Sequence, residues 1–295
     1  MKILTFDIGG TFIKYGLVDE KFHLLETNKI PTEASRGGQQ LIEKIIRIVE
    51  DYPQADRVAI STAGQVDSEN GIVVNAPGYI PYYTGMMVKA LIEKRTGKPT
   101  FVENDVNAAA MGEAKFGAAT EYNDFICLTY GTGIGGAIFL DGELYKGFGS
   151  SAGEMGHMVT HAGGRQCNCG GEGCYECYAS ANALITAVNR VSAEPLNAFS
   201  IFEKENISKP EIRFEIDKWI DEIIIGLMNI IYTFNPPLIV LGGGIMNEDY
   251  IIELIDRKIY NLLMPNYRNV NIVRSKLGND AALLGVAYQV ATLEE

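Results

Sequence analysis

The chain has 295 residues, of which 47% are hydrophobic and 21% charged. This apolar content can fill buried cores and excludes a predominantly disordered chain. Lys and Arg number 25 against 37 Asp and Glu, which gives a net charge of −12, and no stretch gathers the cations into a basic stripe. Because such a surface repels phosphate backbones, we expect no nucleic-acid partner.

The sequence also lacks the patterns of secretion and membrane insertion. The N-terminus leads directly into a strand pattern, and the longest uncharged apolar run, 223–234, is shorter than the about 20 residues of a membrane span. Four of the five cysteines lie between positions 167 and 177. Without a secretion signal, this clustering favours a metal site over disulfides. We therefore expect a cytoplasmic protein with no membrane partner.

Strand-like and helical patterns alternate along the chain, which predicts an α/β fold. The first half predicts strands at 2–7, 12–18, 22–30, 58–61 and 99–103, and helices at 38–51, 86–96 and from 104 or 105 to about 115. The second half predicts strands at 124–129, 137–140 and 238–241, and helices at 215–234 and 280–292. A strand, a glycine-rich turn and a second strand open both halves, which predicts two similarly built lobes with a close interface over a cleft.

The first glycine-rich turn has the composition of a phosphate site. Gly9 and Gly10 let backbone N–H groups approach phosphate oxygens, Thr11 adds a hydroxyl and Lys14 a nearby cation. Asp7, at the preceding strand end, could hold a hydrated Mg²⁺ beside those phosphates. The alternative is an ordinary type I′ hairpin turn without a ligand.

Two further glycine-rich segments follow strands. The segment 130–136 places Gly131, Thr132, Gly133, Gly135 and Gly136 between two predicted strands, which is more glycine than a tight turn requires. It is neither a Walker loop nor a dinucleotide fingerprint, because no Gly-Lys-Ser/Thr is present and a strand follows. Gly243 and Gly244 follow the strand at 238–241 and are alternatively a plain strand-to-helix loop. Together the three segments predict a site for ATP.

Asp105 is the candidate catalytic base. It stands with Asn104 before a helical pattern, and a helix N-terminus favours an ionised carboxylate. Phosphoryl transfer needs such a carboxylate to accept the proton of the acceptor hydroxyl. The alternative is that Asn104 or Asp105 only caps the helix.

His157, Cys167, Cys169 and Cys174 follow the pattern H-x9-C-x-C-x4-C. Thiolates and an imidazole suit tetrahedral Zn²⁺, and a fully ligated ion is structural. From spacing alone, Cys177 or His161 could replace His157, and free cysteines without a metal are a further alternative. The polar residues that flank this loop, among them Glu154, His157 and Glu176, could bind a polyol or could be solvated surface.

In combination these motifs resemble the ROK family of bacterial repressors and sugar kinases. The likeness spans essentially the whole chain, with markers at 7–11, 61–64, 103–107, 129–136, 153–157, 167–176 and 241–245. The resemblance implies an actin-like ATPase (ribonuclease H-like) fold with two α/β lobes around a cleft. We expect residues 1–117 to form the first lobe, with 280–295 returning to it, and 118–279 to form the second.

The resemblance also implies roles for individual residues. Asp105 matches the catalytic base, and the zinc ligands would be His157, Cys167, Cys169 and Cys174. The sugar-binding residues would be Gly64, Asn75, Asn104, Asp105, Glu154, His157 and Glu176. Gln65 and the segment 75–79 would line the side of the sugar that carries its C1 and C2 substituents. Loss of zinc should then weaken sugar binding and spare ATP binding, because the glycine turns would be distant from the metal.

The implied activity is ATP-dependent transfer of phosphate to the 6-hydroxyl of a hexose or hexose derivative, with Mg²⁺. Family repressors carry an N-terminal DNA-binding extension, and here the phosphate turn begins at Asp7, so we expect a kinase and not a sugar-binding regulator. Glu154 favours a glucose-like substrate, with N-acetylmannosamine or a β-glucoside as alternatives. The family resemblance further implies a homodimer.

Overall fold

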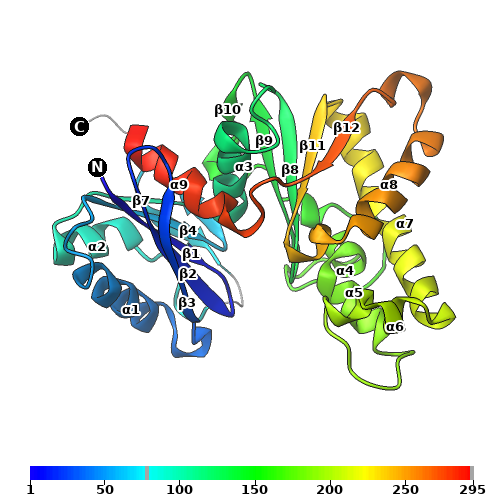
Figure 1. Ribbon diagram of the computed structural model, residues 1–295, viewed down its shortest axis with the longest axis horizontal. Coiled ribbons are helices and arrows are strands. Elements are labelled where there is room, and N and C mark those ends of the chain that lie inside the picture. Colours follow the sequence, from blue (N-terminus) through cyan, green and yellow to red (C-terminus); the bar gives the residue numbers. More distant parts are fainter. Residues whose placement is uncertain (77–79, 293–295) are drawn as a thin grey trace. The chain divides into compact units, whose positions relative to one another are not determined.

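The structure is a computed structural model that describes residues 1–76 and 80–292 (Figure 1). The strands are β1 (Ile3–Ile8), β2 (Phe12–Val18), β3 (Leu24–Pro31), β4 (Arg57–Thr62), β5 (Gln65–Asp67), β6 (Ile72–Asn75), β7 (Thr100–Asn104), β8 (Phe125–Tyr130), β9 (Ile134–Leu140), β10 (Glu143–Leu144), β11 (Leu238–Gly242) and β12 (Asn271–Arg274). The helices are α1 (Gly38–Glu50), α2 (Val88–Thr96), α3 (Asp105–Phe116), α4 (Glu176–Ala179), α5 (Ala181–Val188), α6 (Lys204–Ile207), α7 (Pro210–Phe234), α8 (Asp249–Leu262) and α9 (Ala281–Thr292). The predicted α/β class is confirmed.

The chain divides into two compact units. Unit 1 contains residues 1–121, 144–152 and the segment from Asn279 on, and unit 2 contains 122–143 and 153–278. This division differs from the expected lobes by a few residues at 118–121 and 279, and by the whole segment 144–152, which was assigned to the second lobe and packs in unit 1. The reason is an ion pair to a buried carboxylate of unit 1, described below. Residues 293–295 lie outside the described part of the chain.

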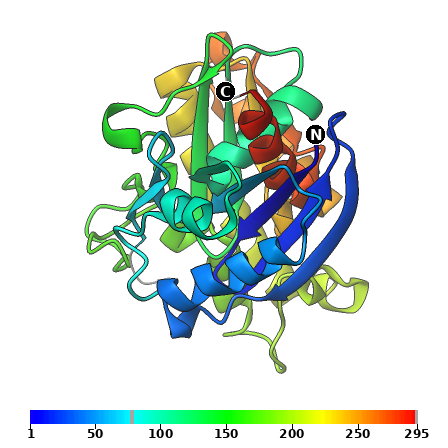
Figure 2. The same cartoon turned by 90° about the vertical axis from the view of Figure 1, so that its left-hand side faces the viewer.

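Unit 1 is built on a sheet with strand order β3-β2-β1-β4-β7. β1 pairs antiparallel with β2 and parallel with β4, which in turn pairs parallel with β7. Successive side chains of β1 point to opposite faces, so Leu4 and Phe6 join a core with α1, while Ile3 joins a second core with α9. Helices therefore cover both faces of this sheet (Figure 2).

Close packing of α3 against α9 completes unit 1. A Cβ added at Gly112 of α3 would overlap the backbone of Ala281, and one added at Gly285 of α9 would overlap that of Ala108. Glycine at both positions lets the two helix backbones approach closely. The segment 281–292 is thus joined to residues that precede it by more than 160 positions in the sequence.

Unit 2 repeats the same arrangement of strands in the order β10-β9-β8-β11-β12. β8 pairs antiparallel with β9 and parallel with β11, which pairs parallel with β12. The predicted repeat of a strand–turn–strand unit is therefore seen as two hairpins at equivalent places in two sheets.

The long helix of unit 2 begins earlier than expected. α7 starts at Pro210, five residues before the predicted start at 215, because proline at the first helical position lacks only an N–H that needs no partner there. α7 packs against α4, α5 and α8. Across residues 1–76 and 80–292, no helix is both long and apolar enough to cross a bilayer.

Candidate functional site

The first glycine turn connects β1 to β2 in unit 1. The Gly9 N–H donates to the Phe12 carbonyl at 3.0 Å, and neither Gly9 nor Gly10 has a positive φ. A type I′ turn requires positive φ at both central residues, so this alternative is wrong. No atom lies within 4 Å of a Cβ added at Gly10, so the turn leaves open space where a phosphate could approach.

Charged side chains flank this turn. Asp7 ends β1 and accepts a hydrogen bond from the Ser61 hydroxyl at 2.6 Å. Burial raises the pKa of Asp7, opposed by that hydrogen bond and by the positive charge of Lys14. The Lys14 ammonium, expected to face phosphate, contacts the Asp280 carboxylate and donates to the Asn279 carbonyl at 3.1 Å. Lys14 is therefore already paired in this structure.

Asn104 and Asp105 lie where β7 ends and α3 begins. Asn104 is the N-cap, and its Oδ1 accepts from the backbone N–H groups of Val106 at 2.9 Å and Asn107 at 3.0 Å. Its Nδ2 donates to Asp105 Oδ1 and to the Gly64 carbonyl, both at 2.9 Å. The capping alternative thus holds for Asn104, whose side chain also orients the Asp105 carboxylate.

The protonation of Asp105 is set by competing effects. Burial and then the negative charge of Asp7 raise its pKa to about 6, while hydrogen bonds from Val106 and Asn104 act in the opposite direction. The helix start was expected to favour the ionised form, and the desolvation that accompanies burial outweighs it. With a pKa of about 6, Asp105 is still mostly ionised at neutral pH.

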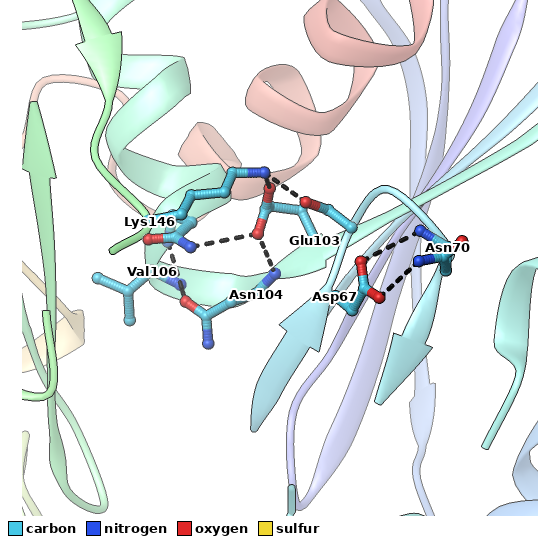
Figure 3. Close-up of polar contacts among 8 residues, drawn as sticks. Asp67, Asn70, Glu103, Asn104, Val106 and Lys146 are labelled. Atoms are coloured by element: carbon cyan, nitrogen blue, oxygen red, sulfur yellow. Dashed lines mark hydrogen bonds and ion pairs between the residues drawn. The ribbon is translucent and has the colours of Figure 1, made fainter. Parts of the chain in front are cut away.

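Glu103, the residue before Asn104, was not singled out from the sequence. Its side chain is fully buried and pairs with Lys146 of the segment 144–152, with Nζ and Oε2 2.7 Å apart (Figure 3). Its Oε1 accepts from the Asn104 backbone N–H at 2.9 Å and from the Asn107 side chain at 3.2 Å. The charge of a buried carboxylate is thus neutralised directly behind the Asn104–Asp105 pair.

The other predicted sugar residues of unit 1 lie near Asn104. Gly64 supplies the carbonyl that Asn104 holds, and Asn75 is the β6 partner of Gln65 in the β5–β6 hairpin. Of the segment 75–79 expected to line the sugar, residues 77–79 lie outside the described residues.

The second glycine turn, in unit 2, is shorter than expected. β9 begins at Ile134, so the turn consists of residues 131–133, closed by a hydrogen bond from the Gly131 N–H to the Gly133 carbonyl at 2.9 Å. Gly135 and Gly136 belong to the strand and pair with Thr129 and Leu128. A Cβ added at Gly136 would come within 2.6 Å of the Gly153 carbonyl, so close packing accounts for this glycine.

The second turn is held by hydrogen bonds with Glu176 and Ala181, which lie outside the turn in the sequence. The Ile134 N–H donates to Glu176 Oε2 at 3.3 Å, and the Ala181 N–H donates to the Gly131 carbonyl at 3.0 Å. Beneath them, the buried hydroxyls of Tyr130 and Tyr175 lie 2.9 Å apart. The Cys167 thiol donates to the other oxygen of Glu176, Oε1, at 3.2 Å. The expectation that this turn is distant from the cysteine loop is therefore wrong, because Glu176 contacts both.

The third glycine segment follows β11. A Cβ added at Gly243 would overlap the Tyr130 carbonyl, so the close approach of β8 requires glycine there. Gly244 opens a short helical turn that ends at Asn247, whose carbonyl accepts from Arg274 at 2.8 Å. Asn247 and residues 274–278 line an open hollow beside this turn, which the sequence analysis did not identify.

The predicted metal ligands lie together in unit 2. The ligand atoms of His157, Cys167, Cys169 and Cys174 all lie within 4.8 Å of one another. The sulfurs of Cys169 and Cys174 are 3.6 Å apart, and Cys167 Sγ is 3.7 Å from His157 Nδ1. Ligands about 2.3 Å from a tetrahedral zinc ion would be separated by similar distances, so this donor set fits Zn²⁺.

One ring nitrogen of His157 lies near the cysteines, and each of the two ring nitrogens also lies near a carboxylate. Nδ1 is 3.7 Å from Glu176 Oε1, and Nε2 is 3.9 Å from Glu154 Oε2. With Nδ1 on a metal, Nε2 would be left to donate to another group. The structure thus gathers the predicted residues Glu154, His157 and Glu176 at the edge of the metal cluster.

Comparisons with known proteins cover nearly the whole chain. The sequence pattern of the ROK family matches residues 3–292. A glucokinase of Thermotoga maritima is 32% identical, with 97% of this chain and 96% of that protein aligned. The crystal structure of a ROK family glucokinase from Streptomyces griseus in complex with glucose and AMPPNP has a TM-score of 0.87 and 29% identity, covering 98% of this chain and 99% of that one. A ROK family transcriptional regulator, a homologue of the E. coli MLC protein, has a TM-score of 0.83 and 26% identity over 98% of this chain and 78% of its own.

Proposed function

The chain belongs to the ROK family, and from this membership and the geometry of its residues we propose that it is an ATP-dependent sugar kinase. The observation that carries the proposal is the Asp105 carboxylate at the start of α3, oriented by the Asn104 side chain and the Val106 N–H. A carboxylate placed in this way can accept a proton without first being ordered. A protein that only senses sugars has no use for such a base.

The proposed reaction transfers the γ-phosphoryl group to a sugar hydroxyl. Asp105 accepts the hydroxyl proton as the sugar oxygen bonds to the γ-phosphorus, and the bond to the β–γ bridging oxygen breaks to release ADP. The pKa of about 6 leaves Asp105 mostly ionised at neutral pH. It also keeps the proton affinity of Asp105 near the working pH, which general-base catalysis favours.

For the nucleotide we propose the three glycine segments. The open backbone at Gly10 and Gly131 can approach phosphate oxygens without obstruction by a side chain. The hollow beside Gly244 and Asn247 would receive the adenosine end. Asp7 has the oxygen donors that Mg²⁺ prefers, and the ion would neutralise phosphate charge.

For the sugar we propose Glu154, His157 and Glu176 within unit 2 and, within unit 1, Gly64, Asn75 and Asn104. Both amide hydrogens of Asn104 are already used, so Asn104 can bind a hydroxyl only by exchanging one of these bonds. A structural Zn²⁺ on His157, Cys167, Cys169 and Cys174 would fix the imidazole that meets the sugar.

The proposed acceptor is the 6-hydroxyl of a glucose-like hexose. We would measure ADP release with glucose, N-acetylmannosamine, N-acetylglucosamine, mannose, fructose and cellobiose, and would use 6-deoxyglucose as the matched control. Activity with glucose and none with 6-deoxyglucose would support the proposal. A preference for N-acetylmannosamine or a β-glucoside would identify one of the alternative kinases. Sugar binding by calorimetry without ADP release from any sugar would favour the non-catalytic regulator.

A further inference from the structure

The segment 144–152 is attached to the rest of unit 1 by an ion pair between Lys146 and the buried Glu103 carboxylate. It begins at Leu144, the last residue of β10, and precedes Gly153, so both of its ends lead into unit 2, yet it packs in unit 1. The Lys146 ammonium contacts the Ser68 hydroxyl and lies 2.7 Å from Glu103 Oε2. Figure 3 shows the Lys146 ammonium beside the Glu103 carboxylate.

Glu103 in turn forms hydrogen bonds with residues on both sides of Asp105. One oxygen accepts from the N–H of Asn104, which precedes Asp105, and from the side chain of Asn107, in the same helical turn. The position of Asn104 in turn fixes Asp105, because the Asn104 side chain donates to the Asp105 carboxylate. From Lys146 to Asp105 the contacts therefore run through Glu103 and Asn104 without a break.

We propose that Lys146 is a positioning residue for the catalytic base: it neutralises the buried Glu103 carboxylate and so keeps Asn104 and Asp105 aligned. A buried carboxylate without its partner is strongly unfavourable and would turn toward water. It would then release the Asn104 N–H and the Asn107 side chain, and the start of α3 would lose its fixed geometry. This inference rests on the proposed kinase function.

The effect should fall on turnover and not on ATP binding. Lys146 contacts none of the residues proposed to bind sugar or ATP, and a displacement of about 1 Å at a reacting group can cost about 100-fold in rate. Lys146→Met should therefore lower kcat about 10- to 100-fold, with the KM for ATP within about threefold of the wild type. Lys146→Arg, which keeps the charge, should restore most of the loss.

A matched control is available in unit 2. Lys258 pairs with Asp221 at the same 2.7 Å, and its side chain is 30% exposed compared with 31% for Lys146. The partners differ, since Asp221 is 62% exposed and Glu103 is fully buried. Lys258→Met should leave kcat unchanged, because a solvated carboxylate tolerates the loss of its partner.

A double variant tests whether the unpaired charge of Glu103 is what misaligns Asn104 and Asp105. In Glu103→Gln/Lys146→Met no buried charge remains, and the glutamine oxygen can still accept from Asn104 and Asn107. Its kcat should exceed that of Lys146→Met alone. A folded Lys146→Met enzyme with wild-type kcat, or a double variant slower than Lys146→Met, would overturn the proposal.

If the wild-type protein phosphorylates no sugar, the proposed function fails while the positioning role can still be measured. Backbone amide hydrogen exchange at residues 104–107 should then be at least about tenfold faster in Lys146→Met than in Lys258→Met. Equal exchange in the two variants would overturn the proposal. Should Lys146→Met not fold, the same comparison with Glu103→Gln replaces it.

Discussion

The two hairpin turns of this molecule occupy equivalent places in two similar sheets, yet different surroundings hold them. The turn at 9–11 is fixed from within its own sheet by Thr32, the residue directly after β3. The Thr32 hydroxyl donates to the Gly9 carbonyl at 2.6 Å, and its N–H donates to the Thr11 carbonyl at 2.9 Å. The turn at 131–133 is fixed by residues that follow the cysteine loop, Glu176 and Ala181.

The chemistry beside the turns differs as well. The first lies next to Asp7, whose negative charge acts on Asp105 within the same unit. The second turn contains no charged residue and is held by Glu176, which also contacts the cluster of His157 and three cysteines. We infer that disturbing unit 1 near Asp7 and Asp105 changes the chemical step, while disturbing the cysteine loop changes binding.

The largest effect should come from Asp105→Asn. We expect kcat to fall about 10²- to 10⁴-fold because the base is lost, while the asparagine oxygen can still accept from Asn104 and Val106 and sugar binding persists. Asp51→Asn, at the exposed end of α1, is the control and should have wild-type kcat. Steady-state kinetics and calorimetry measure the two quantities, and normal turnover in a folded Asp105→Asn protein would exclude Asp105 as the base.

The next largest effect concerns the metal. Cys169→Ser or chelation of the metal should raise the KM for the sugar about 10- to 100-fold. It should also weaken the binding of ATP, because Glu176 contacts the second turn. Hydrogen exchange should increase at residues 131–134 and not at 9–12. Metal analysis should find about one zinc per chain in the native protein. A metal-free enzyme with unchanged sugar affinity would contradict the zinc site.

A third prediction separates glycines needed by a ligand from glycines needed by packing. Gly131→Val should raise the KM for ATP about tenfold and leave the melting temperature unchanged, since nothing lies within 4 Å of its added Cβ. Gly136→Val should instead destabilise the protein by about 1–3 kcal/mol, because its Cβ meets the Gly153 carbonyl. Thermal unfolding and ATP titration distinguish the two variants, and the reverse pattern would invalidate the assignment of the turn.

The smallest effect is on the pH dependence. Because Asp105 must be ionised to accept a proton, kcat/KM should fall by about half at pH 6 and about tenfold per further pH unit below it. The free energy of unfolding should depend on pH in the opposite direction. Because burial raises the pKa of Asp105 in the folded state, its contribution to stability is largest where it is protonated and is lost as the pH rises through about 6. Asp105→Asn should therefore not lower the melting temperature at pH 7. A pH profile that stays flat down to pH 5 would contradict the assignment.

Local patterns in the sequence predicted the elements that depend on local physics. The hairpin of β1 and β2, the N-cap at Asn104 and the cluster of cysteines all follow from residues close together in the chain. Periodicity also located α1 and α3 to within one or two residues. These features need no knowledge of what packs against them.

Features that depend on distant partners could not be predicted. Gly136 looked like part of a turn because the packing of Gly153 against β9 is invisible in the pattern of glycines. Lys14 looked like a free cation because its partner Asp280 lies 266 positions away. Glu103 lies in the marker segment 103–107 but was given no role, Lys146 lies in no motif, and only the fold brings the lysine to the buried carboxylate.

The close contact between α3 and α9 has a consequence for synthesis on the ribosome. Ile3 and Val18 share a core with Val286 and Val290 of α9, so one face of the first sheet stays uncovered until residues 281–292 have been translated. At about 5–20 residues per second that delay is roughly 15–50 s. All residues of unit 2 are translated before α9. The nascent chain can therefore finish its second unit first, and its earliest strands are among the last to have both faces covered.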